Sequence, residues 1–234
     1  LVGHSAGALV ALELAGRRPD LVRSVFALGP VASASPDGRA SALARLVGAP
    51  LVGPLASRLC LRWWLGGEAR FASGLRTATA PGRRIAGDRA ALQRDMARSD
   101  PRALRAMMLW LRRRNLFETC PRVAAPTCLC LGRRDPVSPP GHQLRILRAL
   151  PQGHAIMMDV GHLPMLEAPE DVAEALAGWL RDRRAPEGAS GNLDSRMGVD
   201  PSEIDASRQP ISATEMIGVA PPARPTSATG DDHP

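Results

Sequence analysis

Gly3-His4-Ser5-Ala6-Gly7 stands directly after Leu1-Val2 and directly before Ala8-Leu-Val-Ala-Leu-Glu-Leu-Ala15. The apolar pair before this stretch is typical of the end of a buried strand, and the residues after it are strong helix formers. The pattern G-x-S-x-G at such a junction predicts a sharp turn from strand to helix with Ser5 at its apex. We expect the flanking glycines to leave room for the turn, and a strained backbone at Ser5 to lift its hydroxyl clear of the sheet.

The length and charge of the chain limit what it can do. Its 234 residues suffice for one medium domain with a substantial core. Residues 1–185 carry 27 arginines against 15 acids, whereas residues 186–234 carry 3 against 8. A basic folded part suits anionic substrates, acidic lipid or nucleic acid, although a solvated basic surface is the default interpretation. We expect a small-molecule ester or acyl substrate, with an anionic one as one option. No nucleic-acid-binding motif accompanies the arginines, and only 3% of residues are aromatic, so nucleic acid is not an expected partner.

The four cysteines do not form the pattern of a disulfide framework, and they lack the spacing of zinc ligands. Cys128 and Cys130 alternate within an apolar run, which predicts a buried strand. No apolar run approaches the roughly 20 residues of a membrane span. We therefore expect neither a metal nor a membrane span, and a cytoplasmic location. Because the chain begins with Leu1 rather than Met, the presence of a signal peptide is left open.

Hydrophobic patterning divides the chain into four parts. Residues 1–34 predict a strand end, a helix to about Arg18 and a second strand, and residues 121–184 return to the same alternation of strand and helix. Between them, residues 35–120 contain helices broken by Gly and Pro and predict an inserted helical lid. Residues 185–234 lack apolar periodicity and predict a disordered tail.

The individual elements follow from short local signals. Strands are predicted over residues 22–28, 126–131 and 155–158, which read as near-continuous apolar runs. Helices are predicted over residues 102–114, 141–150 and from about Pro169 to Arg184. Ser99-Asp100-Pro101 is a helix start, with either Ser99 or Asp100 as the capping residue.

Three residues with complementary chemistry follow three predicted strands in chain order. Ser5 comes after the first strand, Asp135 after the strand ending at Leu131, and His162 after the strand ending at Met158. Functional groups gather at the carboxyl ends of parallel strands. A hydroxyl that attacks, a base that takes its proton and an acid that orients the base are the parts of a nucleophilic serine site. The order Ser…Asp…His is that of one fold family.

The chain resembles the α/β-hydrolase superfamily at three segments. These are Gly3–Gly7, the nucleophile elbow of that family, Leu131-Gly-Arg-Arg-Asp135-Pro-Val-Ser-Pro and Gly161-His162-Leu-Pro-Met-Leu-Glu-Ala-Pro-Glu170. The resemblance implies an α/β fold with a mostly parallel sheet flanked by helices and an inserted helical lid. It also implies that Ser5 is the nucleophile, His162 the general base and then acid, and Asp135 the orienting carboxylate.

The same resemblance bears on the remainder of the site. The backbone N–H of Ala6 would supply one oxyanion-hole donor at a helix N-terminus. The family's sheet has further strands before the elbow strand, and the second oxyanion donor lies among them. We therefore expect that this chain lacks the first part of its domain and is poorly stable and inactive alone. The elbow and lid together also resemble hydrolase-like proteins associated with magnesium chelatase in bacteriochlorophyll synthesis.

Several further residues allow a functional or a structural interpretation. His4 lies beside the nucleophile, but packing is the favoured role. Asp159 is an alternative acid, although its closeness to His162 in sequence favours a role in the loop. Glu167 is a candidate to hold the His162 loop by hydrogen bonding. Trp63-Trp64 suits a pocket or a membrane contact, with ordinary lid packing favoured.

The sequence therefore predicts a serine hydrolase that cleaves a carboxylic ester or related acyl bond through an acyl-enzyme, with no cofactor. An acyltransferase or a cofactor-free perhydrolase would use the same three residues with a different acceptor. A non-catalytic protein of the same fold, which binds a ligand or partner through its basic lid, is a third possibility. The substrate and the oligomeric state do not follow from the sequence.

Overall fold

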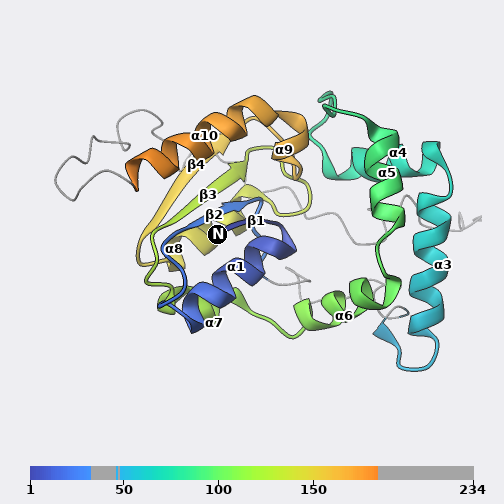
Figure 1. Ribbon diagram of the computed structural model, residues 1–234, viewed down its shortest axis with the longest axis horizontal. Coiled ribbons are helices and arrows are strands. Elements are labelled where there is room, and N and C mark those ends of the chain that lie inside the picture. Colours follow the sequence, from blue (N-terminus) through green and yellow to red (C-terminus); the bar gives the residue numbers. More distant parts are fainter. Residues whose placement is uncertain (33–45, 47, 184–234) are drawn as a thin grey trace, which may run out of the picture.

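The centre of the molecule is a four-stranded parallel sheet. The structure is a computed structural model that describes residues 1–32, 46 and 48–183 (Figure 1). The strands are β1 (Val2–His4), β2 (Val25–Leu28), β3 (Thr127–Gly132) and β4 (Gly153–Met158), and they lie in the order β1-β2-β3-β4. All neighbouring strands are parallel, so the carboxyl ends of all four strands meet at one edge.

Helices cover both faces of this sheet (Figure 1). The first face carries α1 (Ala6–Arg17), α7 (Leu116–Thr119), the short 3-10 helix η1 (Cys120–Arg122) and α8 (Pro140–Ala149). The opposite face carries α10 (Pro169–Asp182), which follows the short α9 (Pro164–Glu167). Each connection between consecutive strands contains a helix on the first face, as expected for crossovers of one hand.

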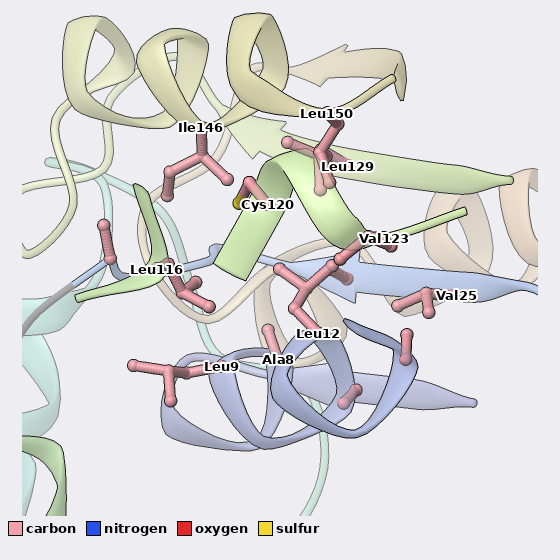
Figure 2. Close-up of a cluster of buried hydrophobic side chains, with 14 of the residues drawn as sticks. Ala8, Leu9, Leu12, Val25, Leu116, Cys120, Val123, Leu129, Ile146 and Leu150 are labelled. Carbon is pink, nitrogen blue, oxygen red and sulfur yellow. The ribbon is translucent and has the colours of Figure 1, made fainter. Parts of the chain in front are cut away.

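Alternation along the strands sends apolar side chains into two separate clusters. Val25, Leu129 and Leu12 belong to the cluster beneath α1 and α8 (Figure 2). Their strand neighbours Phe26 and Cys128 point to the other face and pack against α10. Because side chains alternate between faces with a period of two residues, one short apolar strand can supply both clusters.

A helical segment, the α3–α6 segment, joins β2 to the second half of the sheet and stands to one side of it (Figure 1). It contains α3 (Gly53–Leu65), α4 (Glu68–Ala78), α5 (Arg89–Ala97) and α6 (Pro101–Leu111). Leu65, Phe71 and Leu75 form its own buried cluster. Leu163, from the loop after β4, packs against that cluster and so connects it to the sheet edge.

Most of the predicted elements occur with small shifts at their ends. The strand predicted from residue 22 begins at Val25, and the helix predicted to Arg114 ends at Leu111. Asp100 is the capping residue of α6, because its Oδ1 accepts a hydrogen bond from the N–H of Arg102 at 2.9 Å. The sequence interpretation did not include α9.

The residue limits given for the lid, 35–120, stay a prediction from sequence. Leu111, Leu116 and Cys120 belong to the cluster beneath α1, so packing with the sheet begins before residue 120, where the lid was expected to end. The tail expected to be disordered, 185–234, lies outside the described residues, as do residues 33–45 of the segment between β2 and α3.

Two observations concern expectations about membranes and cysteines. In the part of the chain that the structure describes, no helix combines the length and apolar character needed to cross a membrane. Cys128 and Cys130 are buried in β3 as predicted, and neither forms a disulfide. Burial raises the pKa of each thiol to about 12, so both are protonated at neutral pH.

Candidate active site

Ser5 lies at the tight turn between β1 and α1. Its φ of 51° makes it the one residue other than glycine with a positive φ among the described residues. A non-glycine residue in that region costs about 1–3 kcal/mol and is retained where the surroundings hold it in place. Here the Ser5 N–H donates to the Leu28 carbonyl oxygen at 2.9 Å, and the Ser5 carbonyl accepts from Leu9 N–H at 3.2 Å. The elbow is therefore fixed by β2 on one side and α1 on the other.

The two glycines of the motif have different environments. A Cβ added at Gly3 would lie 2.5 Å from the carbonyl oxygen of Gly7, so the turn requires glycine at this position. At Gly7 an added Cβ would meet no described atom within 4 Å. The expectation that both flanks of Ser5 are crowded is thus correct for Gly3 and wrong for Gly7, because Gly7 is an exposed residue of the first turn of α1.

The three predicted site residues meet at the carboxyl edge of the sheet. His162 Nε2 lies 2.9 Å from Ser5 Oγ, and His162 Nδ1 lies 2.8 Å from Asp135 Oδ2. His162 and Asp135 are each 3% exposed, whereas Ser5 is more accessible. Serine hydroxyl, imidazole and carboxylate thus form one continuous hydrogen-bonded chain that ends in a buried acid.

The Asp135 carboxylate is anchored in its own turn. Its Oδ1 accepts hydrogen bonds from the N–H groups of Val137 and Ser138, both at 2.8 Å. Its Oδ2 accepts from Gln143 Nε2 at 3.1 Å, in addition to the contact with His162. The acid is therefore held with Oδ2 facing the imidazole.

Gln143 and Ser138 were not identified from sequence. Both are fully buried, and the Ser138 hydroxyl donates to the Pro30 carbonyl oxygen at 2.7 Å. Gln143 Nε2 also donates to the Ser138 carbonyl. A signal was available for Gln143, because it shares a helix face with Ile146 and Leu150, which are both buried. A polar residue on an apolar face needs a buried partner.

The loop that carries His162 is held by Glu167, as the sequence predicted. Glu167 is 6% exposed, and its Oε2 accepts from the N–H of Ala80 and of Gly161, both at 2.9 Å. Its Oε1 accepts from Leu163 N–H at 3.2 Å. One carboxylate therefore ties the N–H groups on both sides of His162 to the loop that follows α4.

Gly29 follows β2 and lies directly against the His162–Asp135 pair. Its φ is +48°, and an added Cβ would lie 3.2 Å from His162 Nδ1 and 3.4 Å from Asp135 Oδ2. The conformation favours glycine, and the contacts leave little room for any side chain. The carboxyl end of β2 thus forms one wall of the site.

Ala6 and Asp159 take the positions that the sequence favoured. Ala6 is the first residue of α1, so its N–H has no acceptor within the helix. It directly follows Ser5 in the sequence. Asp159 is exposed and forms an ion pair with Arg134 Nε at 2.8 Å, rather than a contact with His162. Asp135, not Asp159, is the acid that faces the imidazole.

Residues 1–175 match a model of the family described as "Alpha/beta hydrolase family". The chain belongs to the alpha/beta hydrolase family. A comparison with curated proteins finds no significant match.

Solved structures of other alpha/beta hydrolases and related enzymes share this fold. An esterase from Thermogutta terrifontis is 23% identical with a TM-score of 0.56, and the match covers 79% of this chain and 65% of that one. An enol-lactonase from Burkholderia xenovorans is 16% identical with a TM-score of 0.55, covering 77% and 64%. A putative lipase from Acinetobacter baumannii is 18% identical with a TM-score of 0.58, covering 78% and 60%. At these identities the likeness establishes the fold.

The matched part of this alpha/beta hydrolase spans somewhat less than two thirds of each of those three proteins. Within the described residues, no group of three or more His, Cys, Asp or Glu side chains is placed to hold a metal ion. The site consists of a hydroxyl beside an imidazole beside a buried carboxylate. Such a chain can move a proton from oxygen to nitrogen and stabilise the resulting cation.

Proposed function

We propose that this alpha/beta hydrolase is a serine hydrolase that cleaves a carboxylic ester or a related acyl bond. The observation that supports this most strongly is the hydrogen-bonded chain Ser5–His162–Asp135, with distances of 2.9 and 2.8 Å. The strained backbone of Ser5 gives a second reason, because strain of this kind concentrates at functional sites.

In the proposed reaction, Ser5 Oγ attacks the carbonyl carbon of the ester while His162 Nε2 takes the hydroxyl proton. Asp135 stabilises the imidazolium through its contact with Nδ1. The negative charge on the former carbonyl oxygen is stabilised by the N–H of Ala6, at the positive end of α1. The carbon–oxygen bond to the alcohol then breaks, and His162 returns its proton to the departing alcohol.

The acyl group is at that point bound to Ser5 and is removed by water. His162 accepts a proton from the water as its oxygen attacks the acyl carbon. The bond to Ser5 Oγ breaks, His162 gives the proton back to Ser5, and a carboxylic acid leaves. Net, one ester and one water become one acid and one alcohol, with the protein restored.

The basic α3–α6 segment supports an anionic substrate. Residues 58–114 contain 14 arginines and 4 acids. A pocket of about 820 Å³ in this segment is lined by Arg58, Arg62 and Arg102 together with Leu61, Leu65 and Asp100, and none of the residues that line it belongs to the Ser5–His162–Asp135 site, so its arginines would act on a substrate through their field. We propose that an ester bearing a carboxylate or phosphate is preferred over a neutral one, because a field of one sign raises the local concentration of oppositely charged ligands.

Hydrolysis of p-nitrophenyl esters by the purified full-length protein and its variants tests the proposed function. Ser5→Ala should lower kcat by on the order of 10⁶-fold and Asp135→Asn by on the order of 10⁴-fold. Asp159→Asn is the matched control, because Asp159 is an exposed acid of the same loop region and bonds to Arg134. Full activity in folded Ser5→Ala would refute the role of Ser5 as nucleophile, and no hydrolysis by folded wild type would favour a non-catalytic binding protein.

The acceptor of the acyl group is tested separately. An acyltransferase or a cofactor-free perhydrolase would form the same acyl-enzyme and pass it to an alcohol or to peroxide. Product analysis with these acceptors in competition with water distinguishes the three activities. A carboxylic acid as the main product supports the hydrolase. A transferred ester would instead indicate an acyltransferase, and a peracid would indicate a perhydrolase.

A further inference from the structure

The residue before Ser5 contacts the main chain of His162. His4 Nε2 lies 2.7 Å from the carbonyl oxygen of His162, and the two imidazole rings are 5.0 Å apart between centroids. Because a carbonyl oxygen only accepts, His4 Nε2 carries the hydrogen and donates it. This contact joins two segments that are 158 residues apart in the chain.

His4 makes this bond as a neutral ring. Burial, together with the nearby His162, lowers the pKa of His4 from 6.5 to about 4. At neutral pH the ring therefore carries a single proton, and the distance to the carbonyl places that proton on Nε2. A neutral donor restrains the His162 main chain without adding a second positive charge beside the imidazolium of the proposed reaction.

The bond from His4 complements the other bonds around His162. The N–H of His162 donates to the Ala78 carbonyl at 2.8 Å, and Glu167 holds the neighbouring N–H groups. Those contacts hold the N–H groups of residues 161–163. His4 instead holds the carbonyl group of His162, and it belongs to the same turn as Ser5.

We propose that His4 is a positioning residue that fixes the main chain of His162 so that Nε2 stays within hydrogen-bond distance of Ser5 Oγ. This inference rests on the proposed function of Ser5 and His162. Since His4 and Ser5 are adjacent in one turn, this bond links the element that carries Ser5 directly to the main chain of His162. Displacing a reacting group by about 1 Å can cost roughly 100-fold in rate.

Substitutions at His4 separate positioning from packing. His4→Leu removes the donor and keeps much of the volume, whereas the amide of His4→Gln offers an N–H donor at similar reach. Both are compared with His142→Leu, a partly buried histidine elsewhere that accepts from the Ala32 N–H at 3.2 Å. The readouts are kcat and KM for an ester, the rate constant of serine modification by a fluorophosphonate, and the melting temperature.

The proposal predicts that His4→Leu lowers kcat and the modification rate constant by about 10- to 100-fold with KM changed less than about twofold. His4→Gln should recover most of this loss, and His142→Leu should change neither rate constant. If the fluorophosphonate does not modify the wild type, the proposed function of Ser5 fails. That outcome is distinct from a failure of the positioning role of His4. Wild-type rates in folded His4→Leu, or no recovery in folded His4→Gln, would overturn the positioning role.

A further pair keeps the test decisive if His4→Leu does not fold. His4→Asn carries the same amide donor as His4→Gln on a shorter side chain, so it should not reach the His162 carbonyl. We expect His4→Asn to lose kcat relative to His4→Gln at equal folded fraction. Equal kcat in the two variants would contradict the proposal.

Discussion

Glu167→Ala should destabilise the protein substantially, because the Glu167 carboxylate serves three backbone donors. It accepts from the N–H groups of Ala80, Gly161 and Leu163 at 2.9, 2.9 and 3.2 Å. Each buried N–H left without a partner costs about 1–3 kcal/mol, and relaxation of the loop recovers part of the sum, so we expect a loss of about 3–5 kcal/mol. That is a large share of the roughly 5–15 kcal/mol that stabilises a typical domain.

Glu167→Gln separates the acceptor from the charge. Its amide oxygen can occupy the position of Oε2 and keep the bonds to Ala80 and Gly161. Its NH₂ group then faces the N–H of Leu163, which loses its acceptor. We expect this variant to lose about 1–2 kcal/mol.

Urea unfolding and thermal melting measure both variants, with Glu170→Ala as the control because Glu170 is an exposed glutamate of the following helix. The midpoint should fall at unchanged m value, and the melting temperature of Glu167→Ala should fall by roughly 6–20 °C. Glu170→Ala should melt within about 1 °C of the wild type. If Glu167→Ala matched that control, the proposed anchoring of the His162 loop would be refuted.

Three further predictions follow from the site and its surroundings. Gly29→Ala should lower kcat and stability together, because the backbone is left-handed and the new Cβ crowds His162 Nδ1 at 3.2 Å; unchanged kinetics would contradict this contact. The free energy of unfolding should fall as pH drops from 6.5 towards 4, because the unfolded chain binds a proton at His4 while burial keeps this ring unprotonated in the folded chain. The change in the pKa of His4 from 6.5 to about 4 sets an upper limit of about 3 kcal/mol on this loss. Water reaches part of the ring, so the loss stays below that limit; urea midpoints across pH should show a flatter profile in His4→Gln, and an equally steep one would exclude His4 as the source. The double variant Arg58→Gln/Arg62→Gln should lower kcat/KM for a carboxylate-bearing ester several-fold at low salt while a neutral ester is unaffected; equal effects on both esters would argue against an anionic substrate.

The fold could be predicted from sequence because its signals are local and agree with one another. Ser5, Asp135 and His162 each follow a short apolar strand, and parallel strands bring such positions to one edge. The helix start at Asp100 is equally local, since an acidic cap before a proline has few other interpretations. Elements whose identity rests on adjacent residues were therefore placed to within a few positions.

Contacts between distant segments could not be predicted in the same way. The bond from His4 to the His162 carbonyl depends on how closely the elbow approaches the loop after β4, and no spacing in the sequence measures that distance. The support that Gln143 gives to Asp135 has the same character. Glu167 could be identified because it lies only five residues after His162 in the sequence. At that separation, a contact with the His162 loop can be inferred from the local sequence.

Modification of the full-length protein by a fluorophosphonate, followed by peptide mapping, shows whether Ser5 is an activated nucleophile. We expect a single adduct on the peptide that contains Ser5, abolished in His162→Ala and retained in Asp159→Asn. An adduct on another serine, or none on folded protein, would contradict the assignment of Ser5 as an activated nucleophile.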